Sequence, residues 1–501
     1  MRFLSVLAGF VGLASAMLKV KHRGLDQQSD PLNRRESAAY PANTIDMPID
    51  HFPHNPRYAP HVTGTFKQRY FFDSSYYKPG GPVYLYISGE TSGTNRFSNL
   101  QTGIIQILME ATNGLGVIIE DRYYGKSYPF ANSTTDNLRY LTTEQTIADN
   151  AYFAQHATFP GVEGNLTAPG TPWILYGGSL AGGETAFSLK EYGDILFGGI
   201  ASSAPVKTVL PYPEWYDPIQ KYGPQDCISS VNAIVEKIDY LVDSHKEEAI
   251  NELKAIFGLE KLKDIRDFAM TIAFPIGGPM NYPKDTWQEL NWYPAYSAPD
   301  FFDFCSNVTN INAPASVTAF DNALAKYTHG KPWVNLGNYA DFFKKAFLPL
   351  CPSGDYDSTS CFGTQNASFW ADESNGPGRS YLYTSNNGVL GPSHAESTTP
   401  SLELQISEQP TNTAASISKL IDLPIDPWLG LCYHAPGTPV RESSDLNPEY
   451  LIAGAGHHWD SSGIKNIPAE PLFIQQAHLW EIKTVQKWLR TFKDWKPGHG
   501  K

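Results

Sequence analysis

Short, continuous runs of apolar residues recur along the first half of the chain and predict the strands of a parallel sheet. They are PVYLYISG from Pro82, LGVIIEDRYYG from Leu115, WILYGG from Trp173 and FGGIASSAP from Phe197. Runs of this kind are typical of strands that are buried on both faces. Between the second and third runs, a segment from Thr142 has the spacing of a helix capping box, followed by helical apolar periodicity. Strands that alternate with helices predict an α/β fold.

This alternation stops after Pro205 and returns late in the chain. The region in between has helical stretches, such as the one from Ser229, and long segments rich in Pro, Tyr and Trp, which indicate a mostly helical insertion. The sheet pattern resumes near Ile421, gives another strand at EYLIAGAG and ends in a helix from about Leu472 to Phe492. The predicted parts are an N-terminal segment or propeptide at 17–42, an α/β core at 43–206 and 406–495, and a helical cap at 207–405.

The first residues, MRFLSVLAGFVGLASAM, have the layout of a secretory signal peptide. Arg2 supplies a positive start, residues 4–13 form an apolar run too short to span a bilayer, and ASA at 14–16 is a small-residue cleavage site. We therefore predict a signal peptide at 1–16 and a secreted, extracellular mature protein. A buried N-terminal helix is the alternative.

Sequons and cysteines agree with export. In an oxidising compartment most cysteines are paired, and because this chain has five, one is free or pairs outside the chain. Cys351 and Cys361 bracket a loop rich in Ser, Gly and Asp, which favours a local pair. The Asn-x-Ser/Thr sequons, which predict glycosylation, begin at Asn132, Asn165, Asn307 and Asn366.

Composition excludes some classes of partner. The 501 residues carry a net charge of −13, which argues against nucleic acid and against anionic membrane surfaces, because both repel a net-negative protein. Hydrophobic residues make up 41% and charged residues 18%, as in ordinary folded proteins. No His/Cys cluster has ligand spacing, so we expect no metal and no cofactor. The oligomeric state is left open.

The stretch WILYGGSLAGGETAF holds a candidate nucleophile, Ser179. An apolar strand precedes it and a helix-like run follows, as in a nucleophile elbow, the sharp turn that exposes a serine at the edge of a sheet. The usual Gly-x-Ser-x-Gly pattern is incomplete, because Ala181 stands where the second glycine belongs and glycine comes at Gly182. The requirement for small neighbours is steric, so alanine weakens the signal without removing it. The alternative is a glycine-rich turn that only packs tightly.

A serine nucleophile needs a base and an orienting acid, which follow it in α/β-hydrolases in the order Ser, Asp or Glu, His. Asp426 lies in IDPWLG, where it opens a strand-to-loop segment, and His457 lies in AGAGHHWD just after a predicted strand. Asp426 would orient the imidazole, and His457 would take the serine proton and return it to the leaving amine. The alternatives are His458 as the base and Asp422 or Asp460 as the acid.

The oxyanion hole is expected to use two backbone N–H groups. One belongs to Leu180, directly after the nucleophile. The second comes from the SGETSG loop, Ser88 to Gly93, at Gly89 or Glu90.

Four motifs together resemble the prolyl carboxypeptidase and dipeptidyl peptidase II family of serine peptidases, in the manner of a secreted, fungal-type member. GGSLAGGETAFSLKEY followed by GGIASSAPV is similar to the family's nucleophile region, which carries glycine where Gly182 stands. EDRYYGKSYPF resembles its His-Arg-Tyr-Tyr-Gly segment, with Asp121 in place of His. IDPW and GHHWD resemble its acid and base motifs, which implies catalytic roles for Asp426 and His457.

The resemblance implies an α/β-hydrolase fold with a helical cap whose aromatic residues line the S1 pocket. It implies a secreted exopeptidase that cleaves peptides after proline, as a carboxypeptidase or a dipeptidyl peptidase, at acidic pH. Leu180 replaces a tyrosine of the family, and Ser385 and Asn387 replace a Cys and a Glu of its cap. These departures keep a prolyl endopeptidase, an esterase on the same fold and a non-catalytic binding protein open as alternatives.

Overall fold

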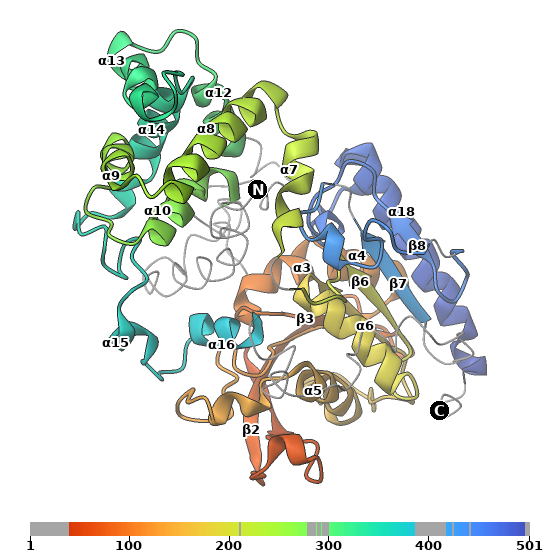
Figure 1. The fold of residues 1–501 in the computed structure, drawn as a ribbon. Coiled ribbons are helices and arrows are strands. Elements are labelled where there is room, and N and C mark those ends of the chain that lie inside the picture. Colours follow the sequence, from red (N-terminus) through yellow and green to blue (C-terminus); the bar gives the residue numbers. More distant parts are fainter. Residues whose placement is uncertain are drawn as a thin grey trace. The chain divides into compact units, whose positions relative to one another are not determined.

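The computed structural model describes residues 40–209, 212–277, 287, 292, 300–385, 417–422, 425–439 and 442–495. Within them the chain forms two compact units (Figure 1). One unit runs over Val209–Asp372, and the other takes in the chain up to Thr208 and from Glu373 onward. The predicted signal peptide, the segment at 17–39 and Asn387 lie outside the described residues.

The second unit is built on a sheet of eight strands in the order β1-β2-β4-β3-β5-β6-β7-β8. The first two pairings, β1 with β2 and β2 with β4, are antiparallel, and all others are parallel. This confirms the predicted α/β fold. The strands are β1 (Asn43–Pro48), β2 (Thr65–Asp73), β3 (Val83–Ile87), β4 (Leu115–Ile119), β5 (Trp173–Gly178), β6 (Gly198–Ser202), β7 (Ile417–Asp422) and β8 (Glu449–Leu451).

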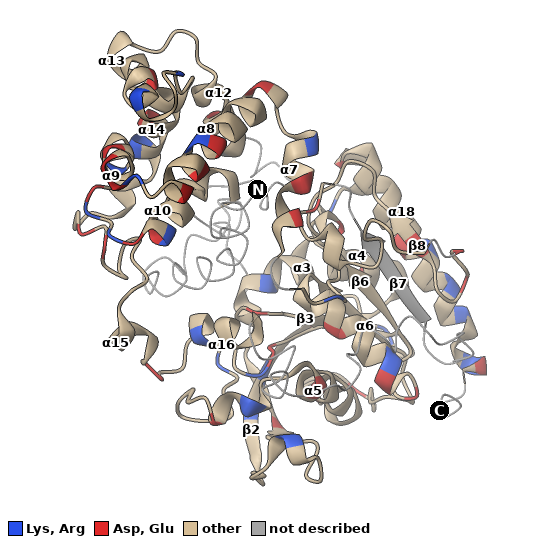
Figure 2. Cartoon of the chain, in the orientation of Figure 1, with Lys and Arg blue, Asp and Glu red and all other residues tan. Residues whose placement is uncertain are grey.

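The central strands carry the apolar runs that predicted them. Every residue of β3, β4 and β6 is buried, as expected for strands covered on both faces. β3 and β6 carry no charged residue, whereas β2 nearer the sheet's edge does (Figure 2). By contrast β2 alternates between exposed and buried positions over its first residues, which marks it as a half-covered strand near the sheet's edge.

Helices cover both faces of this sheet, with α5 and α6 on one side and α4 and α18 on the other (Figure 1). The predicted capping box is present at α5, where the Thr142 hydroxyl accepts from the Gln145 N–H at 3.2 Å. The predicted C-terminal helix is α18. The helices are α3 (Phe97–Gln101), α4 (Ile104–Thr112), α5 (Thr143–His156), α6 (Leu180–Tyr192), α16 (Pro377–Tyr383) and α18 (Leu472–Thr491).

Helix α16, which the sequence placed in the cap, belongs to the sheet unit. Its Ser380 hydroxyl donates to the Tyr123 carbonyl at 2.9 Å, and Thr384 next to it lies 3.1 Å from the Tyr124 hydroxyl. Tyr383 joins the apolar core of the same unit. These contacts tie a late segment to the loop after β4, a pairing that local periodicity does not reveal.

The regular elements of the other unit, within its described residues, are all helices. Both disulfides lie in it, Cys227–Cys305 and Cys351–Cys361, the second as predicted. The fifth cysteine, Cys432, is buried in the sheet unit outside both disulfides. The helices are α7 (Asp217–Tyr222), α8 (Gln225–Asp243), α9 (Glu247–Ile256), α10 (Ile265–Ile272), α11 (Phe274–Gly277), α12 (Asp300–Val308), α13 (Ala315–Thr318), α14 (Leu336–Ala346) and α15 (Ala367–Trp370).

Candidate active site

Ser179 is the single residue between β5 and α6, and its backbone conformation is strained. Its φ is 59° and its ψ is −130°, in a region that non-glycine residues rarely adopt. A strand that ends in such a residue and continues directly into a helix has the geometry of a nucleophile elbow. The carbonyl of Ser179 accepts from the N–H groups of Gly182 and Gly183, so the first helical turn fixes the serine in place.

The positions of this turn that need glycine are Gly177 and Gly182, whereas position 181 accepts alanine. A Cβ added to Gly177 would lie 1.9 Å from the Ala181 carbonyl oxygen, and one added to Gly182 would lie 2.8 Å from the Ser202 carbonyl oxygen. The methyl group of Ala181 is buried beside Gly89, where even an added Cβ would lie at an ordinary contact distance of 3.6 Å. The turn therefore tolerates Ala181, which accounts for the incomplete motif.

Asp426 and His457 are brought together at the carboxyl end of the sheet. Asp426 follows β7 and His457 follows β8, and the ends of neighbouring parallel strands meet at one edge. The His457 Nδ1 lies 2.8 Å from Asp426 Oδ2. The Asp426 carboxylate is fully buried, and its Oδ1 accepts from the Trp428 N–H at 2.9 Å. This second bond orients the carboxylate toward the imidazole, whose Nε2 is the nitrogen that a catalytic base would use.

The histidine loop meets the elbow. A Cβ added to Gly178, one residue before Ser179, would lie 3.0 Å from the ring of His458. The His458 N–H donates to the Ser203 hydroxyl at the end of β6, at 3.0 Å. The structure thus brings the loop of His457 to the strand end that carries Ser179.

The alternative residues have other contacts. His458 has its Nδ1 3.0 Å from the Ser461 hydroxyl, and burial together with the neighbouring His457 holds its pKa well below the usual range. Asp460 accepts from the Tyr176 hydroxyl at 2.6 Å and from the Ser202 hydroxyl at 2.5 Å. The side chain of Asp422 lies outside the described residues.

The loop that was predicted to complete the oxyanion hole packs against the first turn of α6. Gly89 has a φ of 68° and faces Ala181, which places Glu90 beside the elbow. The far end of this loop is held by Glu120, whose buried carboxylate accepts from the Gly93 N–H at 3.0 Å and from the Ser127 hydroxyl at 2.9 Å. No role for Glu120 was predicted, although it is the first residue of the EDRYYG motif.

A buried ion pair lies behind this loop. Arg122 donates to both oxygens of Asp149, at 2.7 Å and 2.6 Å, and neither side chain is exposed by more than 1%. The charge of Arg122 and its hydrogen bonds outweigh burial and lower the pKa of Asp149. His51 Nε2 adds a third contact to Asp149 at 2.7 Å. The pair ties β1, α5 and the segment after β4 together, which also went unpredicted.

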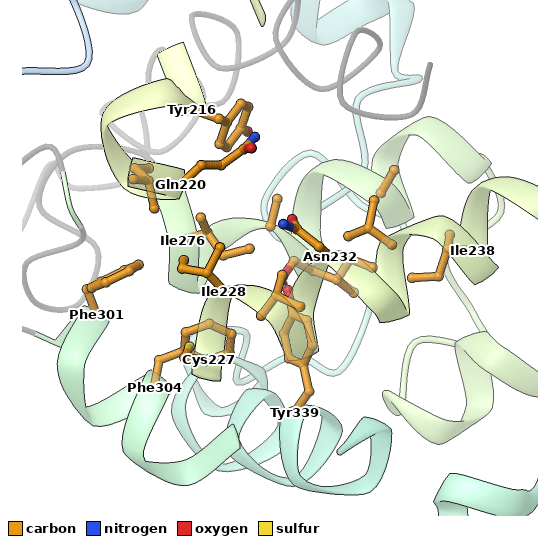
Figure 3. Close-up of a pocket in the computed structure, with 16 residues that line it drawn as sticks. Tyr216, Gln220, Cys227, Ile228, Asn232, Ile238, Ile276, Phe301, Phe304 and Tyr339 are labelled. Carbon is orange, nitrogen blue, oxygen red and sulfur yellow. Dashed lines mark hydrogen bonds between the residues drawn. The ribbon is translucent and has the colours of Figure 1, made fainter. Parts of the chain in front are cut away.

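The helical unit, described by itself, contains an apolar cavity of about 50 Å³ (Figure 3). Aromatic side chains and the Cys227–Cys305 disulfide contribute to its wall, and Gln220 and Asn232 are the amides among its lining residues. Cavities of this composition hold apolar groups. The aromatic residues are Tyr216, Phe301, Phe304 and Tyr339.

The remaining predicted sites were the sequons, whose four asparagines are all exposed: Asn132, Asn165, Asn307 and Asn366. Among the described residues, no group of three or more His, Cys, Asp and Glu side chains could hold a metal ion. Nor does any described helix have the length and apolar character that crossing a membrane requires.

Comparisons with known proteins identify the family of this chain. The serine carboxypeptidase S28 family matches residues 48–345. A probable extracellular serine carboxypeptidase of Arthroderma benhamiae is 35% identical, over 94% of this chain and 70% of that protein. Serine protease vicPb of Bipolaris victoriae is 32% identical over 61% of this chain and 56% of its own length. The lysosomal Pro-X carboxypeptidase of Bos taurus is 34% identical over 33% of this chain and 32% of its own length. The chain therefore belongs to the serine carboxypeptidase S28 family and is a serine-type peptidase.

Proposed function

We propose that this protein is a secreted exopeptidase that hydrolyses peptide bonds after proline, with Ser179 as nucleophile, His457 as base and Asp426 as orienting acid. The observation that carries the proposal is the 2.8 Å contact between His457 and Asp426, on the loop that reaches the Ser179 elbow. A buried carboxylate that fixes Nδ1 of an imidazole beside a strained serine is the arrangement that acyl transfer requires.

In the proposed reaction the Ser179 hydroxyl attacks the carbonyl carbon before the scissile bond, and His457 takes its proton. The oxyanion accepts from the N–H groups of Leu180 and Glu90. His457 then protonates the leaving amine, the C–N bond breaks and an acyl-enzyme remains. Water attacks the ester, gives its proton to His457, and Ser179 recovers its own when the acid leaves.

The preference for proline and the export route belong to the same proposal. Both are supported by similarity: one relative is named a Pro-X carboxypeptidase and another an extracellular carboxypeptidase. The predicted signal peptide at 1–16 supports export as well. Peptides are the proposed substrates, and the net charge of −13 disfavours nucleic acids and anionic membranes as partners.

The test uses three peptides: one with a penultimate C-terminal proline, one with proline second from the N-terminus, and one with internal proline only. Each is incubated with the wild-type protein and with Ser179→Ala, and the products are weighed by mass spectrometry. We expect cleavage after proline at one of the two chain ends, and none by the variant.

Other outcomes point elsewhere. Cleavage of the internal proline alone would replace the exopeptidase with an endopeptidase. Hydrolysis of acyl esters without any peptide cleavage would indicate an esterase. If a fluorophosphonate probe failed to label Ser179 and no substrate were cut, the binding-protein alternative would replace catalysis.

A further inference from the structure

Two carboxyl groups face each other beside the candidate nucleophile. Asp121 follows β4 and is 3% exposed, and Glu184 lies on α6 and is 6% exposed. Within the described residues, neither oxygen of Asp121 and not the Oε2 of Glu184 meets a hydrogen-bond donor. The two carboxyl groups interact with each other, and only a proton on one of them can join them by a hydrogen bond, because two carboxylates have only acceptors.

The pair is directly connected to the predicted oxyanion hole. Asp121, Glu184 and Leu180 line one cavity of about 10 Å³, which has room for roughly one water molecule. No substrate residue fits there, so the pair would influence catalysis without touching the substrate. Glu184 is one helical turn after Leu180, and side chains on a helix tilt toward its N-terminus, so the Glu184 carboxyl lies over the turn that presents the Leu180 N–H.

The surroundings favour the protonated forms. Burial raises the pKa of Asp121 to about 7 and that of Glu184 well above its ordinary range. The charges that face the pair are Glu90 and Asp149, which raise both values, and Arg96, which lowers that of Asp121. Asp149 is neutralised by its own partner, whereas Glu90 has no ion pair within the part of the chain that the structure describes.

We propose that Asp121 and Glu184 are positioning residues that act through Leu180 and restrict the peptidase to acidic pH. While the pair holds its protons, it adds no charge that opposes the oxyanion on the Leu180 N–H. Once the pair is ionised, its negative charge lies beside the negative charge of the transition state and raises the barrier. This inference rests on the proposed function, since it assigns a role to the neighbours of the same serine.

The test compares kcat and KM from about pH 4 to about pH 9 for the wild-type protein and the double variant Asp121→Asn/Glu184→Gln. The wild-type kcat should fall about tenfold or more above neutral pH. There the Asp121–Glu184 pair loses a proton, and its added negative charge disfavours the oxyanion. The double variant has no charge to gain, so its kcat should stay level there, with little change in KM. Asp267→Asn removes a buried carboxyl from the helical unit and should keep the wild-type profile.

A second measurement needs no variant. Ordinary carboxyl groups are ionised at pH 6.5, so the infrared C=O band of a protonated carboxyl should persist there in the wild-type protein and vanish at high pH. Absence of the band would overturn the inference, as would an unchanged alkaline fall in kcat in the folded double variant. In both cases peptide cleavage and probe labelling of Ser179 would leave the proposed function standing. A wild-type protein that neither cleaves nor labels would refute the function itself, and this inference with it.

Discussion

Replacing Asp149 by asparagine tests whether the Arg122–Asp149 pair holds the sheet unit together. The substitution keeps the size of the side chain and removes its charge. Arg122 is fully buried and also donates to the carbonyls of Ile49 and Tyr140, so it cannot turn toward water without breaking those bonds. The guanidinium would remain buried without a counter-charge.

The expected cost follows from that burial. Removing one partner of a buried ion pair typically costs about 3–5 kcal/mol, because the remaining charge is left uncompensated. The pH dependence has a definite sign. Because the folded pKa of Asp149 is lowered, its contribution is present above the ordinary Asp pKa of about 4 and is lost as the pH falls through the folded value. The difference between wild type and variant should therefore shrink in strong acid.

The assay is urea unfolding at pH 6, with calorimetry to separate the transitions of the two units. Asp46→Asn is the matched control, because Asp46 pairs with Lys67 on the same sheet at 2.8 Å but both side chains are at least 60% exposed. Exposed pairs contribute little, so this variant should unfold like the wild type. If Asp149→Asn cost no more than the control, the account of the buried pair would be refuted.

Three further predictions concern stability. Gly177→Ala should cost more than about 3 kcal/mol, because its Cβ would lie 1.9 Å from a backbone oxygen of α6, and a wild-type melting temperature would contradict this. Replacing Cys227 and Cys305 by serine opens a loop of 78 residues and should destabilise the helical unit by about 4–5 kcal/mol in urea. Burial lowers the pKa of His478, but its hydrogen bonds to Glu470 and to the Asp460 carbonyl and the charges of Glu481 and Glu470 together raise it above its ordinary value. Its stabilisation is therefore present below about pH 6.5 and lost as the pH rises through the raised value. The wild-type melting temperature should therefore decline as the pH rises above about 6.5, and His478→Gln should make this decline smaller.

Much of the sheet could be predicted because β3, β4, β5 and β6 are covered on both faces and carry continuous apolar runs. The half-covered strands β1 and β2 could not, since their polar and apolar residues mix and neither has a run. The residue at which the helical insertion ends also could not be predicted from the local sequence pattern. Ser380 and Thr384 join the sheet unit through contacts with Tyr123 and Tyr124, which are distant in sequence.

Some features of the candidate site could likewise be predicted from the sequence, and others could not. Asp426 and His457 were predictable because chain order and strand position bring the loops after β7 and β8 to one edge of the sheet. The sharp strand-to-helix turn at Ser179 was predictable despite Ala181, because the close contact at this turn falls on Gly182. The Asp121–Glu184 pair was not, since an isolated acidic residue in a sequence is most often exposed, and only the fold brings these two together.

The most direct test of the catalytic assignment is the rate at which a fluorophosphonate labels Ser179 in wild type, His457→Ala and His458→Ala. Peptide mapping locates the label, and circular dichroism checks the fold. We predict that loss of His457 slows labelling about a thousandfold or more, because the serine loses its base, while loss of His458 leaves most of the rate. The reverse order, or a label on another residue, would contradict the triad of Ser179, Asp426 and His457.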